Sequence, residues 1–96
     1  MRIVSELLNQ NGRVYVYLSS EEICNRFLQD AEKEGFTFCD GLKPTKRKGA
    51  DIYALNQNRT INYVGFIGHI AFQSAKKIGN QKLVKINYEE YISSDI

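Results

Sequence analysis

The segment from Ser19 to Gly35 constrains the fold most, because its apolar side chains recur with the period of an α-helix. One face of the helix carries Ile23, Cys24, Phe27, Leu28 and Ala31, and the opposite face carries Glu21, Asn25, Asp30 and Lys33. Ser19 stands three residues before Glu22, a spacing that predicts a capping box at the helix start. Gly35 supplies the residue at which such a helix ends. The apolar face of this helix must therefore pack against another element of the fold.

That partner is predicted to be a β-sheet. Residues 13–18 are rich in β-branched and aromatic side chains, and Val14, Val16 and Leu18 would share one face of a strand. Residues 83–88 alternate in the same way and predict a final strand. Residues 51–55 and 61–66 flank an asparagine-rich connection of hairpin length, so we expect them to pair antiparallel.

The remaining segments are less distinctive. Residues 36–39 predict a short strand and residues 40–50 an exposed loop. Residues 1–10 fit a short helix ending before Gly12, or the first arm of a hairpin that Asn11 and Gly12 would close. Residues 70–75 fit a strand or a helical turn, and residues 89–96 a tail on the surface. Together these elements predict an α+β fold, with a mainly antiparallel sheet of four to five strands and one main helix packed on one face.

Size and composition narrow the class of protein. The chain has 96 residues, a hydrophobic fraction of 43% and a net charge of +2. These values predict a single folded domain over residues 1–96 and exclude a strongly cationic nucleic-acid footprint. No apolar run is long enough for a membrane span and the first residues lack a signal-peptide core, so we expect a cytoplasmic protein. The two cysteines, Cys24 and Cys39, are then expected to be reduced.

The main local anomaly of charge is a basic loop between two predicted strands. Its cations and hydroxyl would suit an anion such as a phosphate group, although an ordinary solvated loop has the same composition. The candidate ligand-binding residues of this loop are Lys43, Thr45, Lys46, Arg47 and Lys48. A second cationic group follows later in the chain, and the sequence leaves open whether the two groups meet. It comprises Lys76, Lys77, Lys82 and Lys85.

Aromatic side chains could add a surface on which a nucleobase stacks. We expect Tyr63 and Phe66 to serve in this way, although tyrosine is also an ordinary strand residue. His69 is expected to contact a ligand or to be structural, because a general base would need a nucleophile and an orienting group that the sequence does not supply. Cys24, Cys39 and His69 lack the paired spacing of a zinc site. We therefore expect no catalytic residue, metal or cofactor.

Three motifs carry a resemblance to known sequences. They are Gly35-Phe36-Thr37-Phe38, Lys43-Pro44-Thr45 with Arg47, and Ile61-Asn62-Tyr63-Val64-Gly65-Phe66. In these motifs the chain resembles small uncharacterised proteins encoded by phages and prophages of Firmicutes. The resemblance implies an inhibitor of host immunity in the cytoplasm of the host cell, either a sponge for nucleotide second messengers or a protein that blocks a nuclease. It carries no functional residue over to this chain.

We therefore expect a small non-enzymatic binding protein, a phage anti-defence protein that sequesters an anionic nucleotide signalling molecule. The alternatives are a protein–protein inhibitor that blocks a host defence effector, in the manner of an anti-CRISPR, and a direct nucleic-acid-binding protein. The expected partners are the nucleotide or a host defence protein, and no membrane. A homo-oligomer would let two short chains build a pocket that one cannot.

Overall fold

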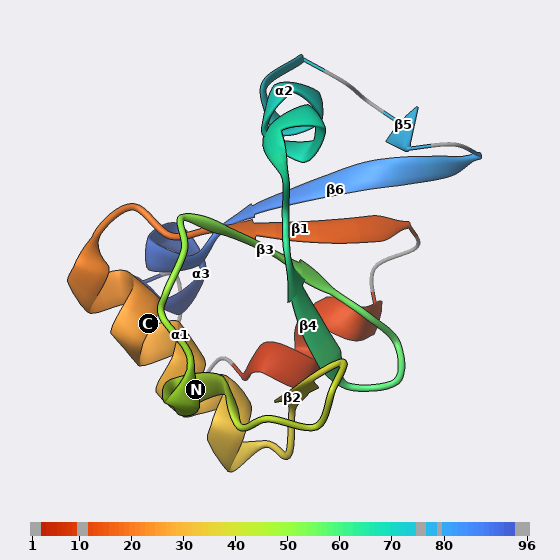
Figure 1. Ribbon diagram of the computed structural model, residues 1–96. Coiled ribbons are helices and arrows are strands. Elements are labelled where there is room, and N and C mark those ends of the chain that lie inside the picture. Colours follow the sequence, from red (N-terminus) through yellow and green to blue (C-terminus); the bar gives the residue numbers. More distant parts are fainter. Residues whose placement is uncertain (1–2, 10–11, 75–76, 79, 94–96) are drawn as a thin grey trace.

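The computed structural model describes residues 3–9, 12–74, 77–78 and 80–93 (Figure 1). The side chains of Phe66, Ile67 and Ile78 also lie outside the description. In chain order the elements are the 3₁₀ helix η1 (Val4–Asn9), β1 (Arg13–Tyr17), α1 (Glu21–Lys33), β2 (Thr37–Phe38), the 3₁₀ helix η2 (Pro44–Lys46), β3 (Ile52–Leu55), β4 (Thr60–Tyr63), α2 (Phe66–Ser74), β5 (Lys77–Ile78), β6 (Gln81–Asn87) and α3 (Tyr88–Ser93).

The fold is α+β, as the sequence predicts, but the sheet is mixed. Its strands lie in the order β2-β4-β3-β1-β6, and β5 adds a short hairpin to β6 at one edge. β3 pairs antiparallel with both β1 and β4, which confirms the predicted hairpin. β1 runs parallel to β6, and β2 runs parallel to β4. The prediction of a mainly antiparallel sheet is therefore wrong, because alternation reveals a strand but not the direction of its neighbour.

The main core lies between one face of the sheet and α1, η1 and α3. Val14, Val16 and Leu18 all point into it, as their alternation predicts. The ring of Phe27 on α1 lies 5.7 Å from that of Tyr53 on β3 and 5.1 Å from that of Tyr88 on α3. α3 is thus packed into the core through the fully buried Tyr88, which the sequence assigned to the end of the last strand. Residues 89–93, predicted to begin a surface tail, are helical: Tyr91 and Ile92 pack against the core, whereas Glu89, Glu90 and Ser93 are exposed. Residues 94–96 of the predicted tail lie outside the described residues.

The opposite face of the sheet carries a smaller apolar cluster that α2 covers (Figure 1). Phe72 of α2 packs there over the buried strand residues Tyr15, Ile52, Ala54 and Leu83 and over Val64, which follows β4. A helix on each face contradicts the prediction of one main helix on one face. Residues 70–75, whose type the sequence left open, are helical as far as Ser74, and β4 ends at Tyr63.

Capping signals in the sequence place the ends of α1 to within one residue of the observed positions. The N-cap of α1 is Ser20, whose hydroxyl oxygen accepts a hydrogen bond from the backbone N–H of Ile23 at 3.2 Å. Ser19, the predicted cap, instead donates to Glu89 of α3 at 2.8 Å. Gly35 follows the helix with a φ of 85°, as predicted. The first segment is a short helix of the 3₁₀ type rather than a hairpin arm.

Within the described residues, no helix combines the length and apolar character that crossing a membrane requires.

Candidate functional site

The basic loop is anchored to the body of the protein rather than freely solvated. Pro44, at the start of η2, is fully buried. Thr45 donates its backbone N–H and its hydroxyl to one carboxylate oxygen of Glu32, at 3.2 and 2.7 Å. These two bonds, with Lys43 and Lys46 nearby, lower the pKa of the Glu32 carboxyl. The hydroxyl expected to bind a ligand is therefore engaged with α1.

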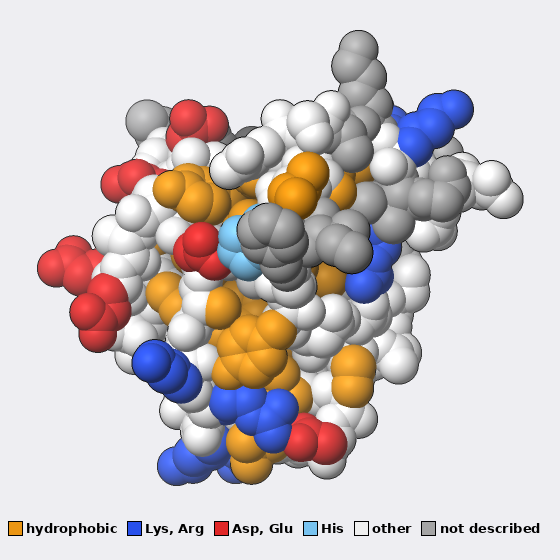
Figure 2. Space-filling view, turned by 45° about the horizontal axis from the view of Figure 1, so that its top comes forward, with side chains coloured by type: hydrophobic (Ala, Val, Ile, Leu, Met, Phe, Trp, Pro, Cys, Tyr) orange, Lys and Arg blue, Asp and Glu red, His pale blue; other side chains and the backbone are white. Residues whose placement is uncertain are grey.

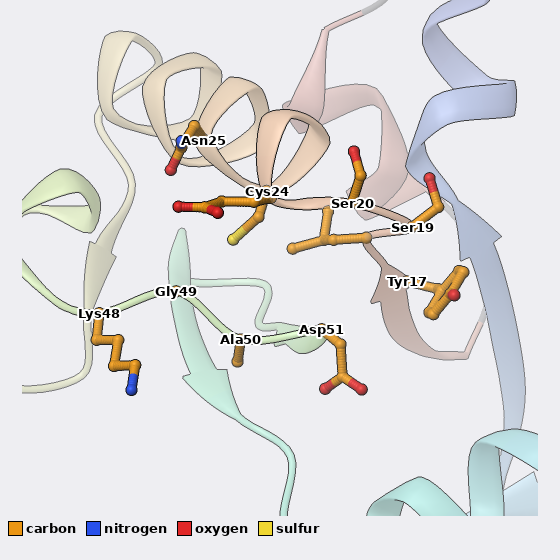
Figure 3. A pocket seen from close by; sticks show the side chains of 11 residues that line it. Tyr17, Ser19, Ser20, Cys24, Asn25, Lys48, Gly49, Ala50 and Asp51 are labelled. Atoms are coloured by element: carbon orange, nitrogen blue, oxygen red, sulfur yellow. The ribbon is translucent and has the colours of Figure 1, made fainter.

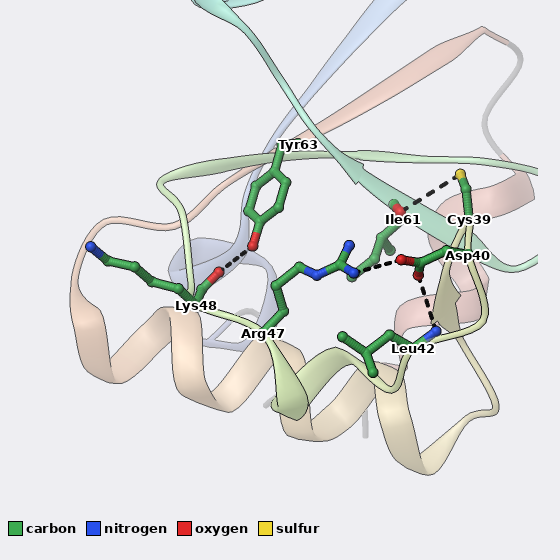
Figure 4. Close-up of polar contacts among 7 residues, drawn as sticks. All are labelled: Cys39, Asp40, Leu42, Arg47, Lys48, Ile61 and Tyr63. Carbon is green, nitrogen blue, oxygen red and sulfur yellow. Dashed lines mark hydrogen bonds and ion pairs between the residues drawn. The ribbon is translucent and has the colours of Figure 1, made fainter.

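Arg47 is likewise held within the protein (Figure 4). Its guanidinium donates to Asp40 at 2.6 Å and lies over the ring of Phe38, 4.5 Å from the centroid. The bond from Arg47, and a further one from the backbone N–H of Leu42, hold the pKa of the Asp40 carboxyl below its usual range. One third of the Arg47 side chain stays exposed. An anion that binds Arg47 must share it with Asp40.

Tyr63 connects this loop to the sheet. Its ring lies 5.5 Å from the ring of Phe38 and 5.5 Å from the ring of Tyr53. Its hydroxyl donates to the backbone carbonyl of Lys48 (Figure 4). The residue remains 41% exposed, so it presents part of an aromatic surface. Phe66 begins α2, but its side chain is outside the described part of the structure.

Lys43, Lys46 and Lys48 are exposed. The second cationic group does not join them. Lys77 and Lys82 lie in the β5–β6 hairpin, at the far end of the sheet from η2 (Figure 1). Lys85 points to the other sheet face, with its ammonium 5.8 Å from the ring centroid of Phe72. Lys76 lies outside the described residues. The two predicted cationic groups are therefore separate, and any anion site at the basic loop is formed without the second group.

His69 on α2 is bonded through both ring nitrogens. Nδ1 lies 3.0 Å from the carbonyl oxygen of Gly65, and Nε2 lies 2.8 Å from a carboxylate oxygen of Asp51. Both oxygens are acceptors, so only the doubly protonated imidazolium donates to both. The Gly65 carbonyl and the Asp51 carboxylate accordingly raise the pKa of His69. The histidine joins α2 to the start of β3 and has no ring nitrogen left for a ligand.

A hollow of about 580 Å³ lies beside this pair, between the start of α1 and the chain leading into β3 (Figure 3). The side chains that line the hollow include Tyr17, Ser19, Ser20, Glu21, Cys24, Asn25, Lys48 and Asp51. The N-terminal end of α1 contributes its positive helix-dipole end. Burial raises the pKa of the Cys24 thiol, so this cysteine is a poor nucleophile at neutral pH.

The backbone around Gly49 closes the inner end of the hollow. A Cβ atom at Gly49 would lie 2.6 Å from the sulfur of Cys24, so only glycine lets the loop approach α1 this closely. The hollow therefore joins two segments distant in sequence, residues 17–25 and residues 48–51. Sequence reasoning identified Lys48 but not the others. Ser20 carried the one available signal, since a polar residue just before a helix often caps it.

The hollow lies next to Tyr63, because the backbone carbonyl of Lys48, which lines the hollow, accepts the hydrogen bond from the Tyr63 hydroxyl. Figure 2 shows one face of the molecule, with hydrophobic side chains along its middle, Lys and Arg side chains below them and also at the right, and most of the acidic side chains at the left. The histidine and an acidic side chain touch in the upper part of the same view. The charge on this face is thus divided rather than uniform.

No group of three or more His, Cys, Asp or Glu side chains among the described residues is placed to hold a metal ion. Comparisons with protein-family models, with curated proteins and with solved structures find no match to this chain. The site is therefore interpreted from its own chemistry.

Proposed function

We propose that this protein is a small non-enzymatic binding protein that holds an anionic nucleotide in the hollow between α1 and residues 48–51. The observation that carries the proposal is the composition of the lining, which places a cation, an aromatic ring, hydroxyls and carboxylates around one space. The volume of about 580 Å³ falls within the range of small-molecule sites. A nucleotide requires this mixture, because it combines an anion with a flat base and sugar hydroxyls.

The lining groups divide between the two ends of such a ligand. Lys48 provides the charge for a phosphate group, aided by the start of α1. The Ser20 oxygen accepts from the helix backbone, so its own O–H remains free to donate to a phosphate oxygen. Tyr17 lines the hollow on the side of the base, and its ring also packs 5.9 Å from the ring of Phe72. The carboxylate of Glu21 and the Asp51 oxygen that is not bonded to His69 accept hydrogen bonds from sugar hydroxyls or a base amino group.

This site differs from the one that the sequence suggests. Thr45 and Arg47 are already bonded to carboxylates of the protein, so a phosphate at the tip of the loop would have to displace Glu32 or Asp40. Lys48 has no such partner among the contacts of the described residues and lines the hollow. The proposal therefore keeps the ligand class and moves the ligand from the loop tip to the hollow.

The role as a binder instead of an enzyme is supported by the state of the titratable groups. His69 donates from both nitrogens, and the raised pKa of Cys24 keeps its thiol protonated. Neither group is available as a base or a nucleophile. The resemblance to phage proteins suggests that the bound nucleotide would be a signal of host defence.

Differential scanning fluorimetry with a panel of mono-, di- and cyclic nucleotides tests the proposal, followed by calorimetry on any hit. A bound nucleotide should raise the melting temperature by mass action. Lys48→Ala should weaken its binding about tenfold or more, since a hydrogen bond to a charged group contributes about 1.5–3 kcal/mol. Lys82→Ala, at the far end of the sheet, is the matched control. A panel without any shift, or equal affinity in the two variants, would contradict the proposal.

A further inference from the structure

The surface beside the hollow has a different chemistry. We define the cation–aromatic patch as Phe38, Leu42, Arg47 and Tyr63, with Lys43 and Lys46 at its rim. Leu42 is 37% exposed and Tyr63 41% exposed, so both present apolar surface among these charges. Tyrosine and arginine are the side chains most enriched at the energetic centres of protein interfaces. The patch therefore has the composition of a protein-binding surface.

Hydrogen bonds within the protein fix the side chains of the patch in the unbound state. Asp40 fixes the guanidinium of Arg47 above Phe38, and its other carboxylate oxygen accepts from the backbone N–H of Leu42 at 3.1 Å. Tyr63 is fixed at its hydroxyl by the carbonyl of Lys48 (Figure 4). Fixed side chains lose little entropy on binding, so more of the contact energy appears as affinity.

The charge of the patch specifies the partner. Asp40 is paired with Arg47, whereas Glu32 is bonded to the uncharged Thr45 and lies near Lys43 and Lys46, so the cations of the patch exceed its carboxylates by one. The ammonium groups of Lys43 and Lys46 are exposed at the rim. A partner with carboxylates around an apolar side chain would pair with these cations while covering Leu42 and Tyr63. A second copy related by twofold symmetry would instead place these lysines against each other.

A nucleic acid fits the same surface less well. Its backbone needs cations along a path, whereas the other lysine group lies at the opposite end of the sheet. Phe38 is only 2% exposed and Arg47 covers it, so its ring is closed to a base. We propose that the cation–aromatic patch docks an acidic protein segment, with an apolar side chain of that segment seated on Leu42 and Tyr63 between Arg47 and the rim lysines.

Fluorescence anisotropy with a labelled synthetic peptide tests this docking site directly. The peptide carries leucine and phenylalanine flanked by glutamates, and the comparison probes are the same peptide with lysines in place of glutamates and a labelled oligothymidylate of equal charge. We expect the acidic peptide to bind, with affinity falling as salt rises. A preference for the oligothymidylate, or equal binding of the basic peptide, would overturn the proposal.

Variants locate the contact. The double substitution Lys43→Glu with Lys46→Glu should weaken peptide binding at least tenfold, and Tyr63→Ser should do the same without changing net charge. Lys77→Glu with Lys82→Glu makes the same charge change at the far end of the sheet and should leave binding within about twofold, since screening removes its long-range effect at physiological salt. Equal losses in the two double variants would refute a local site. The two double lysine variants leave the hollow untouched, so their outcome is independent of nucleotide binding. Tyr63→Ser removes the hydrogen bond to the carbonyl of Lys48, so its effect on the peptide is compared with its effect on nucleotide binding.

Discussion

The imidazole of His69 is the clearest example of a single side chain with a defined chemical state. It donates to a carbonyl of its own helix and to Asp51 of the neighbouring strand, so folding favours its protonated form. Its folded-state pKa is raised above 6.5, whereas that of Asp51 is lowered below 3.8. The stabilisation from His69 is therefore complete below about pH 6.5 and is lost as the pH rises through the folded pKa. The contribution of Asp51 is lost only in acid, as the pH falls through its lowered pKa.

Because the chain has one histidine, its titration can be followed by NMR without assignment. We expect an imidazole pKa above 6.5, and a lower value in Asp51→Asn, which keeps the size of the side chain but removes its charge. The melting temperature of the natural protein should fall between pH 6 and pH 8, because titration of His69 is linked to stability. In His69→Ala this fall should be absent. An imidazole pKa at or below that of a free histidine would contradict the pairing.

Gly68 gives a second prediction at this scale. A Cβ atom there would lie 2.1 Å from a methyl carbon of Val64, whose β-branched side chain cannot move away easily. Gly68→Ala should therefore destabilise the protein by about 1–2 kcal/mol, since the cost of overpacking exceeds the gain of roughly 1 kcal/mol in helix propensity. Urea unfolding measures the change.

Gly65→Ala is the matched control for this substitution. Nothing lies within 4 Å of the corresponding Cβ position, so we expect no loss of stability. Adding Val64→Ala should remove the clash and make Gly68→Ala neutral or stabilising in that background. If Gly68→Ala by itself were as stable as the natural protein, the close approach of α2 to Val64 would be wrong.

Among the elements, α1 shows how closely a local signal can place a helix end. Both serines precede an acidic first turn, but only Ser19 has a glutamate at the capping-box spacing, Glu22. In the structure the cap is nevertheless Ser20, and the hydroxyl of Ser19 is bonded to Glu89 of α3. A contact across the fold thus accompanies a cap one residue away from the one that the local pattern predicts.

Thermal or urea unfolding separates the two serines. Ser20→Ala should cost about 1 kcal/mol, the usual effect of removing an N-cap hydroxyl. Ser19→Ala should change stability by no more than about 0.5 kcal/mol, because its bond to Glu89 is exposed. A larger loss of stability in Ser19→Ala than in Ser20→Ala would identify Ser19 as the N-cap.

The molecule as a whole has helices on both faces of a mixed sheet, and both ends of the described chain take part in the core. Val4 and Leu7 of η1 are buried, as is Tyr88 of α3. The carboxylate of Glu34 accepts from two backbone N–H groups at the start of η1, at 2.6 and 2.9 Å. The hydroxyl of Tyr88 donates to Asp30 of α1 at 2.6 Å. Neither terminal segment is an appendage.

The C-terminal helix is therefore expected to be essential for stability. Tyr88→Ala should cost about 3–5 kcal/mol, the usual loss when a buried aromatic ring is truncated in a core. Glu90→Ala, on the exposed side of the same helix, should stay within about 0.5 kcal/mol. The midpoint of urea unfolding measures both. A small effect of Tyr88→Ala would contradict the packing of α3 into the core.

Periodicity in the sequence determined the helix from Glu21 to Lys33, the buried face of residues 13–18 and the hairpin of β3 and β4. These features depend on which side chains of one segment are apolar, and that pattern is local. Tertiary contacts decided the parallel pairing of β1 with β6, the helix over the second face, the N-cap at Ser20 and the ion pair of His69 with Asp51.

The candidate site divides in the same way. The sequence marked the cations of residues 43–48, because charge is visible without a fold. Only the folded chain shows that Thr45 and Arg47 are engaged by Glu32 and Asp40, and that residues 17–25 and 48–51 enclose a hollow. Apolar periodicity predicts which face of a segment is buried. The packing of all segments together determines which residues that face contacts.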